Sequence, residues 1–281
     1  MNAESKGLLI HIGADTSNDE TLGIVGPVFH DNQFEFIPIV ETMPRQGAPT
    51  YRDIRCTSRQ SSPYNRNLSF YVREPLEQKP CHYDPNPEGF TYSEPPDARR
   101  GKQLLRLLPD DFIFFVASLA QYSEESYREV DTSTIRRHQA GQMTKYLIGY
   151  FKIREVFQVD TSATEQSRHY SIRIARNNAE IDSSMLEAVE PQIRINAHFL
   201  RPSDRFICAV GNRIGMKGQQ RLSLLLPEAI PLTEGWPFKP LPFAERVYGK
   251  LNYPRGHKWI PNDLRPDGLQ TLLSRISELG E

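Results

Sequence analysis

The pentapeptide Cys81-His82-Tyr83-Asp84-Pro85 holds the densest group of reactive side chains in the sequence. In an extended segment side chains alternate with a period of two, so His82 and Asp84 project to the same side. A carboxylate beside an imidazole can fix its tautomer for acid–base chemistry, and both groups can also hydrogen-bond the edge of a ligand. The alternative is an ordinary turn, in which Asp84 caps backbone amides ahead of Pro85 and His82 lies on the surface.

Asn196 and His198 form a second alternating polar pair, and Asp15 follows an apolar run near the N-terminus. Strand ends and loops from distant parts of a chain often meet at one mouth of a barrel. We therefore predict that Asp15, His82, Asp84, Tyr150 and His198 line one concave site. Asp15, His82, Asp84 and His198 are the acid–base candidates, and Asn196 is a candidate for contact with a base edge. For His198 the alternative is a structural histidine whose hydrogen bonds are satisfied inside the fold.

His82, Asp84 and His198 could be imagined as metal ligands, but metal binding is not predicted, because the sequence has no HxH or HxxxH spacing. No cofactor is predicted either. His82 and Asp84 lie in a segment that is too polar for a core. We therefore expect His82→Ala or Asp84→Asn to change the free energy of unfolding by no more than about 0.5 kcal/mol.

A local excess of positive charge follows the second polar pair. Between Pro191 and Leu226 six basic residues accompany one acidic residue, Asp204. Such a stretch can follow a phosphate backbone, and its alternative is a solvated surface with ion pairs. The predicted phosphate-binding residues are Arg194, Arg205, Arg213 and Lys217. A second basic cluster comprises Arg99, Arg100, Lys102 and Arg106.

Short apolar runs rich in aromatic and branched residues predict the strands of a small closed barrel. They cover 8–13, 109–119, 146–153 and 205–211, and Gly149 would permit sharp coiling of the third run. A hairpin is expected over 26–39, and helices over 183–189, 219–226 and 264–279. The segment from Glu41 to Arg100 lacks periodicity but is rich in aromatics, which predicts a long ordered loop.

Composition sets the broad class of the protein. The 281 residues include 34 basic and 35 acidic side chains, so no global nucleic-acid signature exists and any such signal is local. Three separated cysteines and the lack of a long apolar segment predict a reduced, soluble, cytoplasmic protein with no membrane association. We expect one domain over 1–281, whose last part, 231–281, is a helical tail.

The order of several short motifs resembles the third type of nucleotide-modification-associated domain over about residues 8–230. The motifs are His11-Ile12-Gly13-Ala14-Asp15, Gly26-Pro27-Val28-Phe29, Phe34 to Ile39, Thr50-Tyr51, His82 to Pro85, Thr91-Tyr92, Asp111 to Phe115, Tyr146 to Phe151 and Asn196-Ala197-His198. The resemblance implies a role in systems that install, recognise or process modified nucleobases, chiefly in DNA. The strand pattern also resembles PUA-like barrels, which hold a single nucleobase at their mouth.

We therefore predict an α+β fold with a PUA-like β-barrel core, a long ordered loop and peripheral helices. The predicted function is recognition of a modified or flipped nucleobase in DNA, with Tyr51, Phe115 and Tyr150 as stacking residues. The alternative is an enzyme that hydrolyses or transfers a group on a modified base or nucleotide by Asp/His acid–base chemistry. A third reading is a protein-interaction subunit without pocket chemistry. Expected partners are DNA or a modified nucleotide and other nucleic-acid modification proteins.

Overall fold

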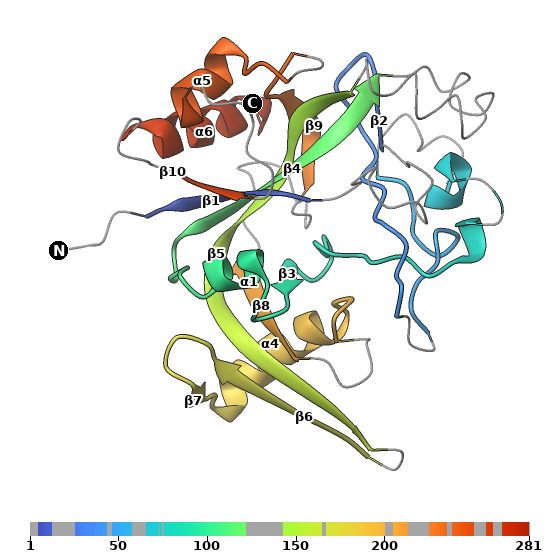
Figure 1. Cartoon of the computed structure of the whole chain (residues 1–281), viewed down its shortest axis with the longest axis vertical. Helices are drawn as coiled ribbons and strands as arrows, with labels where there is room; N and C mark the ends of the chain where they lie inside the picture. The colour runs from blue at the N-terminus through green and yellow to red at the C-terminus, as the bar shows by residue number, and fades with distance from the viewer. Residues whose placement is uncertain are drawn as a thin grey trace.

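The computed structural model shows a mixed α+β fold whose sheet curls into a half-barrel (Figure 1). It describes residues 5–12, 26–43, 47–57, 66–72, 74, 76–121, 143–164, 167–199, 205–212, 225–234, 238–249, 257–260 and 266–280. Asp15 and the phosphate-binding candidates Arg213 and Lys217 lie outside these residues.

The ten strands of the described residues form a single sheet in the order β10-β1-β4-β5-β6-β7, with β2, β3, β8 and β9 attached to its sides. Their bounds are β1 Gly7–His11, β2 Gly26–Val28, β3 Thr91–Glu94, β4 Phe112–Gln121, β5 Met143–Thr164, β6 Ser167–Ile174, β7 Ala179–Glu180, β8 Arg205–Asn212, β9 Leu225–Pro231 and β10 His257–Ile260. The long strand β5 pairs with β4, β6, β8 and β9, so it forms the spine of the curl.

Alternation along β4 explains why this strand is apolar on both faces. Ile113, Phe115 and Ala117 enter one hydrophobic cluster, while Phe114 and Val116 enter another under the C-terminal helices. A register shift after Phe115, opposite Gly149, bends the β4–β5 pair. The glycine predicted to permit coiling therefore lies at the irregular point of the sheet.

The helices are α1 Arg99–Leu104, α4 Ser183–Arg194, α5 Pro242–Tyr248 and α6 Gly268–Ser277, with 3-10 turns η3 Leu68–Tyr71, η4 Leu76–Gln78 and η5 Glu278–Gly280. Helix α4 packs on the sheet over β5 and β8, while α5 and α6 pack together over β1 and β4 (Figure 1). Helix α4 begins where the Asp182 carboxylate accepts a hydrogen bond from the Met185 amide at 2.8 Å, and it buries Val189 and Ile193. The helix predicted over 183–189 is confirmed, and the one predicted over 264–279 is confirmed from Gly268 onward, where α6 begins.

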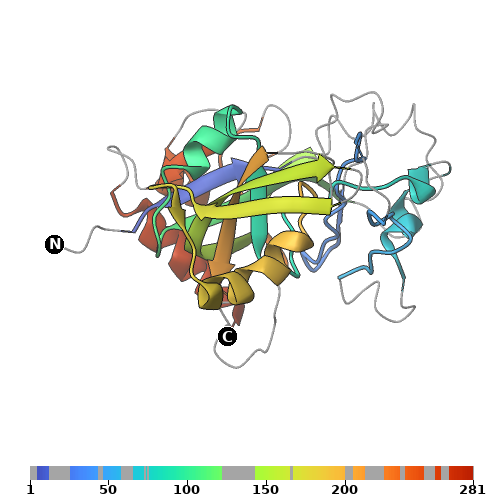
Figure 2. The same cartoon turned by 90° about the horizontal axis from the view of Figure 1, so that it is seen from below.

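The segment between β2 and β3 lies to one side of the sheet in both views (Figures 1 and 2). Its described residues have their own hydrophobic cluster, in which Tyr51, Leu68 and Leu76 are buried. A segment with such a core is ordered without long strands or helices. The prediction of an aperiodic loop up to Arg100 was wrong at its end, where β3 and the start of α1 occur.

Three further expectations need correction. The helix predicted over 219–226 is contradicted at its end, because Leu225 and Leu226 belong to β9. The hairpin over 26–39 reduces to a single bridge between Val28 and Phe34. The tail after residue 230 is not only helical, because β10 pairs with β1 at the sheet edge.

A PUA-like relationship stays a prediction.

Among the described residues, no helix has the length and apolar character needed to cross a membrane.

Candidate functional site

His82, Asp84 and His198 come together although more than a hundred positions separate the first from the last. One nitrogen or oxygen atom from each lies within 4.8 Å of those of the others. The two imidazole rings meet edge to face with centroids 5.1 Å apart, and His198 Nε2 lies 4.0 Å from Asp84 Oδ2. The structure therefore assembles two of the predicted polar pairs into one buried cluster, which we call the His-Asp-His cluster.

Hydrogen bonds from neighbouring residues orient the Asp84 carboxylate at both oxygens. Asn196 Nδ2 donates to Oδ1 at 3.2 Å, and the Ser93 amide donates to Oδ2 at 2.9 Å. Asn196 also donates to Thr91 Oγ1 at 3.1 Å, and its own Oδ1 accepts from the His198 amide at 2.9 Å. Asn196 thus connects Asp84, Thr91 and the backbone of His198.

A second carboxylate holds His82. Glu41 Oε2 lies 2.8 Å from His82 Nδ1, and the Glu41 side chain is almost completely buried. Nothing in the spacing of the sequence indicated Glu41, because it comes from the start of the long segment before η3. The backbone of Glu41 is held beside the segment that carries His82, because the Glu41 amide donates to the Pro80 carbonyl at 2.9 Å.

The cluster is a buried site, which contradicts the expectation that Asp84 belongs to a polar surface loop. The side chains of Asp84 and His198 are 1% and 4% exposed, whereas His82 is 15% exposed. A buried carboxylate is stabilised only when its oxygens have partners. Asp84 does accept a hydrogen bond from the backbone, as the turn alternative expects, but the donor is Ser93 in β3, the strand that follows.

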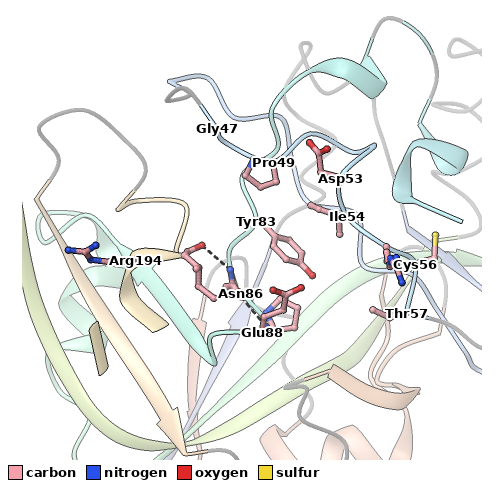
Figure 3. A pocket seen from close by; sticks show the side chains of 13 residues that line it. Gly47, Pro49, Asp53, Ile54, Cys56, Thr57, Tyr83, Asn86, Glu88 and Arg194 are labelled. Atoms are coloured by element: carbon pink, nitrogen blue, oxygen red, sulfur yellow. Dashed lines mark hydrogen bonds between the residues drawn. The ribbon is translucent and has the colours of Figure 1, made fainter. Parts of the chain in front are cut away.

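A cavity of about 670 Å³ lies beside the cluster (Figure 3). Its lining residues are Gly47, Pro49, Asp53, Ile54, Arg55, Cys56, Thr57, Tyr83, Asn86, Pro87, Glu88, Arg194 and Ile195. Tyr83 stands among them as an aromatic wall, and burial raises the pKa of its phenol well above the usual range. The hydroxyl therefore stays protonated and can donate a hydrogen bond.

Asn86 shapes this cavity through three hydrogen bonds of its side chain. Its Nδ2 donates to the Ile195 carbonyl at 3.0 Å, and its Oδ1 accepts from the amides of Glu88 and Gly89 at 2.9 and 2.8 Å. The cluster and the cavity thus share the segment 82–86 and the residues after α4. His82, Asp84 and His198 are not among the residues that line the cavity.

The predicted stacking residues lie elsewhere. Tyr51 is completely buried, and its hydroxyl donates to the Pro38 carbonyl at 2.7 Å. Phe115 is buried against Tyr92 and Phe151 inside the half-barrel. Tyr150 is half-buried and stacks on Phe114 in the cluster near α5 and α6. The three rings thus belong to three different hydrophobic clusters of the described residues.

The described phosphate-binding candidates are exposed and carry ion pairs. Arg194 Nε lies 2.7 Å from Glu190 Oε1, and Arg205 Nε lies 3.2 Å from Asp160 Oδ1. Arg194 also lines the cavity. Arg194 therefore forms a solvated ion pair, as the surface alternative expects, and it also places a positive charge beside a cavity that could hold a ligand.

Sequence reasoning missed a second polar cluster on the sheet. Lys145 Nζ lies 2.7 Å from His11 Nε2 and donates to Ser118 Oγ at 2.5 Å. Burial, together with the charges of Lys145 and Arg100, lowers the pKa of His11 to about 3, so the imidazole is neutral and its Nε2 can accept a hydrogen bond from the Lys145 ammonium group. Lys145 lies directly opposite Ser118 in the β4–β5 pair. The sequence indicates this contact only when the register of the two strands is known.

Comparison with known proteins assigns the family. No curated protein and no solved structure matches the chain. The family model for nucleotide modification associated domain 3 matches residues 6–268. The match begins before β1 and takes in β10, and it therefore extends past the region 8–230 that carries the resemblance. The chain thus belongs to the nucleotide modification associated domain 3 family, which points to a part in a nucleic-acid modification system.

Proposed function

We propose that this protein recognises a modified nucleobase, presented in DNA or as a nucleotide, in the cavity around Tyr83. The single observation that carries the proposal is a cavity of about 670 Å³ with an aromatic wall. Ligand pockets of small molecules measure about 300–1,000 Å³. The space is therefore large enough for a base with its sugar and phosphate.

The chemistry of the lining supports a nucleotide-like ligand. The Tyr83 ring and Ile54 offer apolar surface, and a base stacked on an aromatic ring gains about 1–3 kcal/mol. The Tyr83 hydroxyl and the Glu88 carboxylate provide a donor and an acceptor for a base edge. Arg55 and Arg194 supply positive charge at the same cavity for a phosphate.

The proposal predicts that Tyr83→Ala weakens ligand binding by roughly ten- to a hundredfold, as expected for the loss of one stacked ring. The assay is a binding screen against oligonucleotides and nucleotides that carry different modified bases. Tyr83→Phe keeps the ring and loses only the hydroxyl, so it should retain most of the affinity. Tyr150→Ala is the matched control, because Tyr150 lies in another cluster. Equal losses in Tyr83→Ala and Tyr150→Ala, with both variants folded, would exclude the cavity as the binding site.

A salt titration separates DNA from a free nucleotide as the ligand. If Arg194 contacts a DNA phosphate, Arg194→Ala should reduce the log–log salt slope of binding by roughly one while base preference survives. Arg205→Ala is the comparison, because Arg205 is equally exposed but does not line the cavity. Identical slopes for the wild type and Arg194→Ala would remove this arginine from a DNA interface.

An enzyme that hydrolyses or transfers a group on the same ligand is the second candidate. The closeness of Asp84, His82 and His198 favours it, because a carboxylate and two imidazoles supply an acid and a base. Mass spectrometry of modified nucleosides incubated with the protein tests for turnover. Product formation that is lost in His82→Ala would establish the enzyme, and tight binding without product would establish the recognition module.

A further inference from the structure

We propose that His82, Asp84 and His198 form a binding site for one divalent transition-metal ion, with zinc as the ion that suits the donors. The site lies where the segment before β3 meets the segment before β8. This inference goes beyond the proposed function, because metal binding is measured without any nucleotide ligand.

The donor set carries the proposal. Two imidazoles and one carboxylate are ligands that zinc takes in sites with three protein donors and one open position. Magnesium and calcium prefer oxygen donors alone, so two histidines select against them. The three ligand atoms lie within 4.8 Å of one another. Tetrahedral zinc with bonds of about 2.1 Å holds its ligand atoms roughly 3.4 Å apart, so closure by up to about 1.4 Å completes the site.

Neighbouring residues already hold the donors as such a site requires. A metal-ligating histidine generally donates its other ring nitrogen to a carboxylate or carbonyl group, which fixes its tautomer. His82 Nδ1 contacts Glu41 Oε2 at 2.8 Å, which leaves Nε2 as the nitrogen that coordinates. The Asp84 carboxylate is oriented by Asn196 and the Ser93 amide. Glu41 and Asn196 are therefore positioning residues.

The charge of the cluster also favours a cation. The carboxylates of Glu41 and Asp84 have side-chain exposures of only 4% and 1%, and a buried anion is stabilised by a nearby positive charge in addition to its hydrogen bonds. A divalent ion supplies that charge. Protonated imidazoles are the competing source, and they predict a protein that binds no metal.

The metal would link parts of the chain that the sequence keeps far apart. His82 and Asp84 flank Tyr83, and His198 follows Ile195, so both linked segments also line the cavity. Histidine spacing could not indicate the site, because the donors meet only after β3 pairs with β8 and Asn196 bonds to Thr91. The sequence prediction of no metal is thereby replaced by this proposal.

The test uses the full chain after dialysis against a chelator. Calorimetric titration with zinc should give one ion per chain, and cobalt substitution should give the visible absorption bands of a nitrogen- and oxygen-ligated ion. His82→Ala and His198→Ala should each weaken zinc binding at least a hundredfold. Glu41→Gln should weaken it about ten- to a hundredfold, as is usual for a residue that orients a ligand.

His30→Ala is the matched control, because His30 is exposed and lies outside the cluster. It should bind zinc as the wild type does. Circular dichroism identifies variants that retain the fold, and the partly exposed His82 is the ligand whose replacement is least disruptive. The proposal is overturned if the wild type binds no zinc, or if folded His82→Ala and His198→Ala bind it unchanged. If the wild type binds zinc but binds no modified base or nucleotide, the proposed function is wrong and the zinc site stands.

Discussion

Replacement of Asp84 by alanine tests whether the His-Asp-His cluster is a buried, hydrogen-bonded unit. In the folded protein the Asp84 carboxylate accepts from the Ser93 amide at 2.9 Å and from Asn196 Nδ2 at 3.2 Å. Alanine removes both acceptors without supplying another. The Ser93 amide is then a buried donor without its partner, whereas Asn196 Nδ2 keeps its bond to Thr91 Oγ1.

The magnitude follows from those two losses. A buried donor that loses its partner costs about 1–3 kcal/mol, and the bond from Asn196 adds about 1 kcal/mol. We therefore expect Asp84→Ala to lower the free energy of unfolding by about 2–4 kcal/mol. The loss would be several times the value of no more than about 0.5 kcal/mol that a surface position would give.

Urea unfolding at neutral pH in the presence of a chelator measures this loss without a contribution from metal. Asp97→Ala is the control, because Asp97 is an exposed acidic residue in the turn before α1. It should change the free energy of unfolding by no more than about 0.5 kcal/mol. A change of that small size in Asp84→Ala would refute the reasoning, since it would mean that water reaches the Ser93 amide.

Two further predictions concern the sheet. The pKa of His11 is lowered from 6.5 to about 3, so below pH 6.5 the unfolded chain binds a proton that the folded chain refuses, and stability falls as pH falls from 6.5 toward 3. Between pH 7.5 and 5 this proton uptake lowers the free energy of unfolding by about 2 kcal/mol. Urea titrations at the two pH values should show that His11→Gln lacks this loss, and equal losses in the wild type and the variant would contradict the prediction. Gly211→Ala should cost about 1–3 kcal/mol by overpacking, because its Cβ would lie 2.5 Å from Phe151 Cδ2. The cost should shrink in a Phe151→Leu background, and an equal cost there would exclude this clash as the cause.

Much of the central sheet could be predicted because its strands carry their own pattern. The apolar runs that became β1, β4 and β8 are short, branched and aromatic. Residues of β1 and β4 alternate between the central cluster and the cluster under α5 and α6, and those of β8 alternate between the central cluster and the one under α4. The length of β5 was not predictable in the same way. Beyond Ile153 its residues mix polar and apolar types, because that half pairs with β6 and β8.

The candidate site was predictable in part. Alternation placed His82 with Asp84, and Asn196 with His198, and the structure brings both pairs together. The rings proposed for stacking include Tyr51 and Phe115, which the structure buries in hydrophobic clusters. Alternation alone directs Tyr83 to the side of the segment opposite His82 and Asp84.

That alternation connects the cluster to the cavity. His82 and Asp84 belong to the cluster, while Tyr83 between them lines the cavity, so any change that moves one set moves the other. The same holds after α4, where Ile195 lines the cavity and accepts the Asn86 amide, and Asn196 and His198 belong to the cluster. Because packed segments shift as units, an ion that draws His82 and His198 together also sets the position of Tyr83 and Ile195. Zinc should therefore change the affinity for a base in the cavity, and by reciprocity a bound base should change the affinity for zinc by the same factor.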